Sequence, residues 1–163
     1  MNITLIKQST ILSLIFGGIL GVIAIIPFIG LLAFLTMMFA SASLIMIYMH
    51  KQNQMGLLIP KDAAILSSLI GFASCIGFCT TMIPIAALIA LANHLWFHKL
   101  VWYASIGIWF SYGIAGIIVL VFMVIFVAII AALMNACAGL GTAYVYGQII
   151  NKEETNETFF IDN

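Results

Sequence analysis

The chain has 163 residues, of which 65% are hydrophobic and only 6% are charged, and its formal net charge at pH 7 is zero. A soluble domain carries about 25% charged residues, so this composition excludes a water-soluble globular protein and predicts an integral membrane protein. The basic residues are five scattered lysines that form no basic patch, which excludes nucleic acid as a partner.

The first apolar stretch lies between Lys7 and His50 and contains no charged residue. One membrane-spanning helix needs about 20 apolar residues, so this stretch predicts two spans. It is also longer than the apolar part of a signal peptide, so we expect the N-terminus to be retained. Pro27, which lacks a backbone N–H, and Gly30, which permits a tight turn, mark the break. The two predicted spans are residues 9–26 and 30–49.

A polar segment from His50 to Gly56 separates the second span from the third. Asp62 stands at the start of the next apolar run, where a negative charge suits the N-terminal end of a helix dipole. We predict the third span over residues 63–92, with a kink at Pro84 of the kind that membrane helices tolerate.

Aromatic residues gather just after the third span. All three tryptophans lie between residues 96 and 109, and tryptophan and tyrosine concentrate where a membrane meets water. We therefore predict an interfacial, aromatic-rich segment over residues 94–112, and a fifth span over residues 100–116 is the alternative. The residues expected to anchor this segment are His94, Trp96, His98, Trp102, Tyr103 and Trp109.

The fourth span is predicted over residues 114–146, which completes a single transmembrane domain over residues 1–150 and leaves a short acidic tail over residues 151–163. Four spans place the N-terminus, the loop before the third span and the tail on one side of the membrane. That side carries four of the five lysines (Lys7, Lys51, Lys61 and Lys152), and the other side carries Lys99. The positive-inside rule then predicts a multi-pass protein of a bacterial inner membrane with both termini in the cytoplasm.

Small residues recur at intervals of four along the predicted spans, which makes a flat stripe on one side of each helix. Helices in lipid associate by close packing of small residues and by a few hydrogen bonds. We interpret the stripes as packing within the bundle, and the alternative is that a leftover stripe binds another protein or a second copy. The predicted packing residues are Ser13, Gly17, Gly21, Ala40, Ser67, Gly71, Cys75, Cys79, Asn135, Gly139, Ala143 and Gly147.

Asn135 is the one strongly hydrogen-bonding side chain deep in a predicted span. We expect its amide to bond across the bundle to a serine, a threonine or a freed backbone carbonyl, since polar groups in lipid need partners. The alternative interpretation is that Asn135 lines a pore.

Three motifs carry a resemblance to a known family. Gly17-Gly18-Ile19-Leu20-Gly21 precedes Ile26-Pro27-Phe28 at the end of the first span, Lys61-Asp62-Ala63-Ala64 opens the third, and Ala138-Gly139-Leu140-Gly141-Thr142-Ala143 lies late in the fourth. Together they resemble an uncharacterised family of small, glycine-rich four-span bacterial membrane proteins. The resemblance covers most of the chain and implies a four-span architecture without implying an activity.

Ionisable Asp, Glu, Lys, Arg and His side chains are absent from the four predicted spans, and chemistry inside a membrane depends on such groups. We therefore predict that the protein is not an enzyme. His94 and His98 lack the third protein ligand that is usual for zinc, and Cys75, Cys79 and Cys137 are interpreted as packing residues. No metal or cofactor is expected.

These observations predict an all-α, polytopic membrane helix bundle with four transmembrane helices plus the interfacial segment. The expected partners are membrane lipids and either other membrane protein subunits or further copies of the chain. The expected role is that of an accessory or assembly subunit or of a self-associating bundle. The alternative is an oligomeric pore or carrier for a small solute or a lipid.

Overall fold

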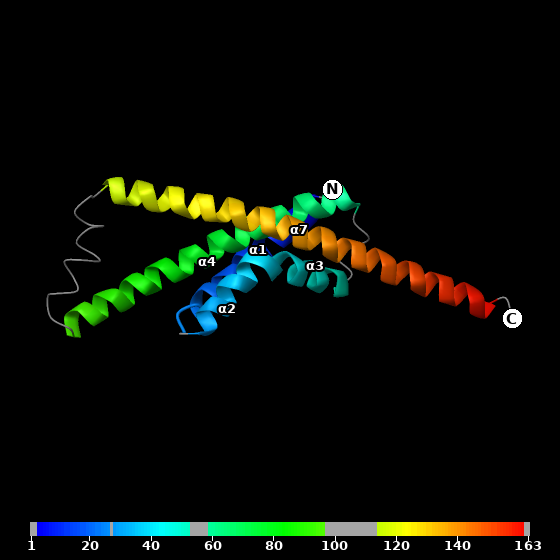
Figure 1. Ribbon diagram of the computed structural model, residues 1–163, viewed down its shortest axis with the longest axis horizontal. Coiled ribbons are helices and arrows are strands. Elements are labelled where there is room, and N and C mark those ends of the chain that lie inside the picture. Colours follow the sequence, from blue (N-terminus) through cyan, green and yellow to red (C-terminus); the bar gives the residue numbers. More distant parts are fainter. Residues whose placement is uncertain (1–2, 27, 53–58, 97–113, 162–163) are drawn as a thin grey trace.

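The computed structural model describes residues 3–26, 28–52, 59–96 and 114–161. Within these ranges the chain consists of helices and the segments that join them, without any strand (Figure 1). The all-α fold class predicted from the sequence is therefore confirmed. In chain order the helices are α1 (Ile3–Ile23), α2 (Ile29–Leu35), the π-helix η1 (Thr36–Ala40), α3 (Ser41–Lys51), α4 (Pro60–Trp96) and α7 (Ile114–Ile161).

Four helical stretches are long and apolar enough to cross a membrane, which fits a multi-pass integral membrane protein. The second stretch is built from α2, η1 and α3, which follow one another without a break. The first helix starts and ends earlier than the predicted span over residues 9–26. The four stretches are Ile3–Ile23, Ile29–Lys51, Pro60–Ile89 and Gly116–Gln148.

A tight turn joins α1 to α2. The first N–H beyond α1, that of Ala24, still bonds the Leu20 carbonyl at 2.8 Å. Phe28 adopts a φ of 68°, which is uncommon for a residue other than glycine. Gly30 lies so close to the Ala24 carbonyl that a methyl group on Gly30 would overlap it. Glycine is therefore needed in this turn for close approach, while the positive φ falls on Phe28.

Neighbouring spans alternate in direction, as the contacts of α1 with α4 and of α4 with α7 indicate. The backbones at Gly17 and Gly21 of α1 lie against Ser74 and Phe78 of α4, respectively. The contact therefore advances along both helices together, and α1 and α4 are parallel. This is the arrangement expected when one span lies between them in the chain.

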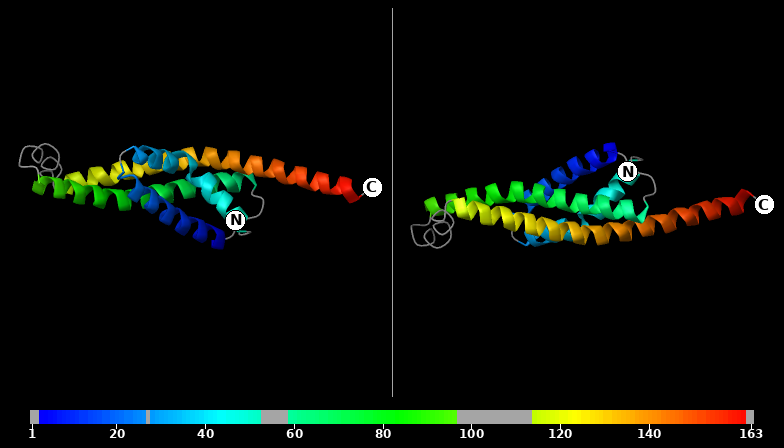
Figure 2. Two further views of the ribbon diagram at one scale, coloured as in Figure 1. Left: turned by 90° about the horizontal axis from the view of Figure 1, so that it is seen from below. Right: turned by 90° about the horizontal axis from the view of Figure 1, so that it is seen from above.

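The longest helices, α4 and α7, are antiparallel. Gly71 of α4 contacts Asn135 of α7, whereas Ser67, one turn earlier in α4, contacts Gly139, one turn later in α7. Figures 1 and 2 show α4 and α7 side by side, with α7 continuing well past the other helices toward the C-terminus. The bundle is therefore shorter than its longest helix.

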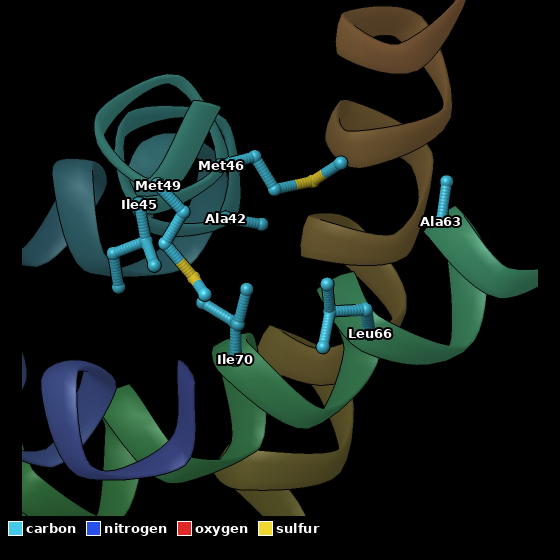
Figure 3. Close-up of a cluster of buried hydrophobic side chains, with 7 residues drawn as sticks. All are labelled: Ala42, Ile45, Met46, Met49, Ala63, Leu66 and Ile70. Atoms are coloured by element: carbon cyan, nitrogen blue, oxygen red, sulfur yellow. The ribbon is translucent and has the colours of Figure 1, made fainter. Parts of the chain in front are cut away.

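Two clusters of buried apolar side chains hold the helices together. The first joins α3 to α4, and Figure 3 shows Met49 reaching from α3 toward Ile70 of α4. The second lies in the other half of the bundle and joins α1, α2, η1, α4 and α7. The first consists of Ala42, Ile45, Met46, Met49, Ala63, Leu66 and Ile70, and the second of Leu20, Ala33, Met37, Cys75, Phe78, Ala128 and Ala131.

Helix α7 continues beyond the predicted span over residues 114–146 and ends at Ile161. The predicted acidic tail, residues 151–163, is thus helical up to Ile161. Its sequence lacks proline and glycine and contains glutamate and lysine, which favour helix.

Candidate functional site

Asn135 of α7 lies inside the bundle with a fully buried side chain. Its Oδ1 accepts hydrogen bonds from the Ala42 backbone N–H at 2.8 Å and from the Ser41 hydroxyl at 2.9 Å. The bonds expected from Asn135 to a hydroxyl and to freed backbone groups are present. Its Nδ2 lies within hydrogen-bond distance of three carbonyl oxygens, those of Met37 (3.1 Å), Met38 (2.9 Å) and Ala131 (2.9 Å).

The π-helix η1 explains why these backbone groups need a side-chain partner. In a regular α-helix the Ala42 N–H would bond the Met38 carbonyl four residues earlier. Here Oδ1 of Asn135 accepts the N–H and Nδ2 of Asn135 donates to the carbonyl. A side chain inserted into the helical hydrogen bonds bends a helix, and single-turn π-helices are common at functional sites. Asn135 therefore replaces one backbone hydrogen bond of the second span and ties that span to α7.

Other polar side chains also link the helices. Ser74 forms no such link: its hydroxyl is fully buried and has no hydrogen-bond partner among the described residues. Three linking hydroxyls lie on α4 and α7 and reach α1 and α3, and the Ser43 hydroxyl of α3 donates to the Ala138 carbonyl of α7 at 3.4 Å. The bonds of the first three are Thr142 to Ser43 (2.8 Å), Ser67 to the Met46 sulfur (3.1 Å) and Thr81 to the Gly18 carbonyl (3.0 Å).

Predicted packing glycines lie where two helices approach most closely. A methyl group on Gly17 would overlap the carbonyl of Ser74, and one on Gly139 would overlap the side chain of Ser67. At Gly71 it would come within 2.7 Å of the Asn135 Cβ. Small residues at such positions let two backbones approach, which is the main source of attraction between helices in lipid.

The remaining predicted packing residues divide by burial. Gly21 also lies against α4, while a methyl group on the partly buried Gly147 would meet no described atom within 4 Å. Ser13, Ser67 and Cys75 are fully buried. Ala40, Cys79 and Ala143 are partly buried.

One side of α7 is open among the residues that the structure describes. A methyl group on Gly141 would meet no atom within 4 Å there, and Cys137 is exposed. Further along, the Gln148 side-chain amide donates to the Tyr144 hydroxyl at 2.7 Å, and both residues are exposed. We call this surface the outer face of α7, and define it by Cys137, Gly141, Tyr144, Val145 and Gln148.

An open cavity of about 590 Å³ lies where the turn after α1 meets α2, η1, α4 and α7. Its lining is almost wholly apolar and includes Phe34 of α2 and Phe78 of α4, whose rings meet edge to face at 6.2 Å. Four of the lining side chains carry sulfur: Met37, Cys79, Met82 and Met123.

Several residues of the site were missed by the sequence reasoning. The predicted packing residue of the second span is Ala40, yet the hydrogen bonds come from its neighbours Ser41 and Ser43. Thr142 of α7, which bonds Ser43, was also missed. The available signal was the run Ser41-Ala42-Ser43, which is a concentration of hydroxyl groups inside an apolar span.

The predicted interfacial anchors fall at the edge of the described residues or beyond it. His94 and Trp96 belong to the last turns of α4. His98, Trp102, Tyr103 and Trp109 lie outside the described residues, as does most of the alternative fifth span over residues 100–116. Among the residues that the structure describes, no three His, Cys, Asp or Glu side chains gather as metal ligands.

Comparison of the chain with models of protein families, with curated proteins and with solved structures finds no match.

Proposed function

We propose that the chain is a non-catalytic integral membrane protein that works by binding other membrane-spanning helices. It would do so as an accessory or assembly subunit of a membrane complex or as a self-associating bundle. The observation that carries the proposal is the outer face of α7. Cys137 and Gly141 stay open on this face, although Asn135 and Gly139 on the inner side of the same helix are packed.

The exposure of the outer face itself supports this role for α7. Its five residues, Cys137, Gly141, Tyr144, Val145 and Gln148, are all exposed. Lipid tails are as apolar as large aliphatic side chains, so moving such side chains from lipid to another helix gains little free energy. A helix therefore binds through the face on which small residues allow close approach. Gly141 and Cys137 are the small residues of the open face.

The polar end of the same face adds directional contacts. The Tyr144 hydroxyl and the Gln148 amide already bond each other at an exposed position. Both groups keep further hydrogen-bonding capacity, because a hydroxyl accepts two bonds and an amide carries both donors and acceptors. A partner helix that reaches this end can therefore be recognised by polar contacts as well as by packing.

The proposed location is a bacterial inner membrane, with both termini in the cytoplasm. Lys7, Lys51 and Lys61 are exposed and belong to helix ends that lie at one end of the bundle, which supports this orientation by the positive-inside rule (Figure 1). A fluorescent protein fused to the C-terminus should therefore fluoresce in cells, whereas a periplasm-dependent phosphatase fused there should stay inactive. The opposite pair of results would reverse the orientation.

Cross-linking at Cys137 tests the proposed binding face directly. Labelling of Cys137 in native membranes with a maleimide that carries a benzophenone, followed by irradiation, should join Cys137 to a partner helix, because the photoreactive group inserts into nearby C–H bonds and needs no thiol on the partner. A product of twice the chain's mass identifies a second copy, and any other mass identifies a different subunit. The product should disappear in Cys137→Ser and should decrease strongly in Gly141→Leu, since the larger side chain keeps the partner helix away.

The matched control is Ile15→Phe, which adds bulk on an exposed position of α1 away from α7. This variant should keep the cross-link. The proposal fails if Cys137 reacts with a monofunctional maleimide but gives no cross-linked product in native membranes. It also fails if Gly141→Leu leaves the yield of the product unchanged.

A further inference from the structure

A groove follows the seam between α4 and α7, which run side by side (Figure 2). Its first section, a hollow of about 400 Å³, is lined by Ile6 of α1, Ala132 of α7 and four residues of α4. A second section of about 480 Å³ lies further along the same two helices, and Phe72 lines both sections. The four α4 residues of the first section are Ile65, Ser68, Leu69 and Phe72.

The groove runs lengthwise along α4 and therefore across the membrane. Ile65, Phe72, Ile76 and Ile83 line it in order, and their spacings of seven, four and seven keep them on one face of the helix. From Ile65 to Ile76 the helix rises by about 16 Å, which is close to half of a hydrocarbon core about 30 Å thick. This part of the groove thus matches the depth of one leaflet.

The lining suits a hydrocarbon chain. The Ser68 and Thr80 hydroxyls donate to carbonyls of their own helix, at 2.8 Å and 2.9 Å, so neither needs a polar partner from outside. Ala128 and Ala132 of α7 have small side chains, which leaves the seam hollow beside them. A hollow without a filling group forfeits dispersion contacts, and a flexible acyl chain restores them without burying a polar group.

Two exposed lysines lie at the outer end of this groove. Lys61 precedes Ile65 by four residues and so shares its face of α4, while Lys7 directly follows Ile6 of α1. A helical side chain tilts toward the N-terminal end of its helix, which for Lys61 is the end of α4 that leaves the membrane. The Lys61 stem can therefore lie along the groove while its ammonium group stays at the level of the lipid headgroups.

The charges around this end favour an anionic headgroup. The ends of α1, α3 and α4 that meet here carry Lys7, Lys51 and Lys61 against the partly buried Asp62. Ser67 faces Gly139 in the antiparallel pair of α4 and α7. Glu153, the first acidic residue of α7, consequently lies about two turns beyond the level of Lys61.

We propose that the groove binds one anionic phospholipid, with an acyl chain between α4 and α7 and the headgroup phosphate paired with Lys61 and Lys7. The charge at the groove's end selects an anionic lipid over a zwitterionic one. The site lies apart from the outer face of α7 and goes beyond the proposed role in helix binding.

Competition between two lipids, followed by native mass spectrometry, tests the site. The full-length protein is released from micelles that contain equal amounts of phosphatidylglycerol and phosphatidylcholine with identical acyl chains. One phosphatidylglycerol should stay bound in preference to phosphatidylcholine. Lys61→Gln should lower this preference about fivefold, the factor that one lysine contributes near an anionic lipid surface.

Matched controls separate the groove from general effects of charge and bulk. Lys51→Gln removes the same charge from α3, which does not line the groove, and should keep the preference. Ala132→Leu fills the hollow and should reduce retention of both lipids. Met134→Phe adds bulk at an exposed position nearly opposite Ala132 on α7 and should not.

A measurement on the unaltered chain complements the variants. Phosphatidylglycerol with a diazirine midway along one acyl chain, placed in phosphatidylcholine vesicles with the protein, should label Phe72 and Ile76 more strongly than the equivalent phosphatidylcholine probe does. Peptide mass spectrometry locates the label, and Lys61→Gln should remove the difference between the probes.

The proposal is overturned if the unaltered chain retains both lipids equally or if the two probes label the groove alike. It is also overturned if Lys51→Gln lowers the preference as much as Lys61→Gln, which would indicate a general response to charge. A lipid-free dimer that Ala132→Leu disrupts would assign the groove to a helix of a second copy instead.

Discussion

The side-chain amide oxygen of Asn135 accepts the backbone N–H of Ala42 at 2.8 Å, across the interface between α7 and the second span. The same amide donates to the Met38 carbonyl at 2.9 Å, which is the group that Ala42 would bond in a regular helix. One side chain thus completes the backbone hydrogen bonding of a helix that lies far from it in the sequence.

Replacing Asn135 with leucine should destabilise the bundle. The apolar side chain has a similar size but leaves the Ala42 N–H and the Met38 carbonyl unpaired, at a cost of about 1–3 kcal/mol for each unsatisfied group. Thermal unfolding in mild detergent measures the change. Gln148→Leu serves as the control, because among the described residues the exposed Gln148 amide bonds the exposed Tyr144 hydroxyl and no buried group. Equal stability of the two variants would contradict the role assigned to Asn135.

Two adjacent glycines of α1 should respond differently to alanine. Gly17→Ala pushes a methyl group into the Ser74 carbonyl, whereas the methyl group of Gly18→Ala would lie 3.4 Å from the Thr81 methyl. We expect Gly17→Ala to cost about 1–3 kcal/mol, as overpacking usually does, and Gly18→Ala to be tolerated. Unfolding in detergent compares them. If Gly18→Ala is the more damaging change, the register between α1 and α4 is wrong.

The hydrogen bond between Thr142 and Ser43, 2.8 Å long, should be measurable as a coupling energy. A double-mutant cycle with Thr142→Val and Ser43→Ala isolates the pairwise contribution. Side-chain hydrogen bonds in membrane proteins contribute about 0.6 kcal/mol on average, so a coupling of that order is expected. A cycle with Thr142→Val and Ser68→Ala is the control, because Ser68 bonds a carbonyl of its own helix. Its coupling should be near zero.

The three thiols should differ in their reaction with N-ethylmaleimide. Cys137 is exposed, Cys79 is partly buried and Cys75 is fully buried. In variants that keep one cysteine each, the rate of modification in detergent should fall in that order. Mass spectrometry of the intact chain follows the reaction. Rapid modification of Cys75 without prior unfolding would show that the α1–α4 core opens.

The main features of the fold could be read from the sequence because lipid imposes a simple length rule. Uncharged runs bounded by lysines, with one interruption at Pro27, predict four spans, and four stretches of suitable length and apolarity are present. Asn135 could be singled out because a strong polar group inside lipid must find partners. The π-helix η1 could not be predicted from the second span alone, since the hydrogen bonds that accompany it involve a side chain of another helix.

The stripe in α7 was only partly predictable, for a geometric reason. An α-helix has 3.6 residues per turn, so residues spaced by four rotate by about 40° at each step around the helix. A stripe that starts at Asn135 has therefore turned by about 120° when it reaches Gly147. Gly139 still faces Ser67, whereas a methyl group on Gly147 would meet no atom of the described residues within 4 Å.

The apolar stretches of α1 and α7 differ in length, and this difference affects how well each helix matches the thickness of the lipid bilayer. The apolar stretch of α1 has 21 residues and that of α7 has 33, which correspond to about 32 Å and about 50 Å of helix. A hydrocarbon core of about 30 Å fits α1 standing upright, but it fits α7 only if that helix leans steeply or the lipid thickens around it. We therefore expect the protein to favour thick regions of membrane, where the mismatch at α7 is smallest. Bilayer thickness would then help to decide where the protein resides, before any partner is bound.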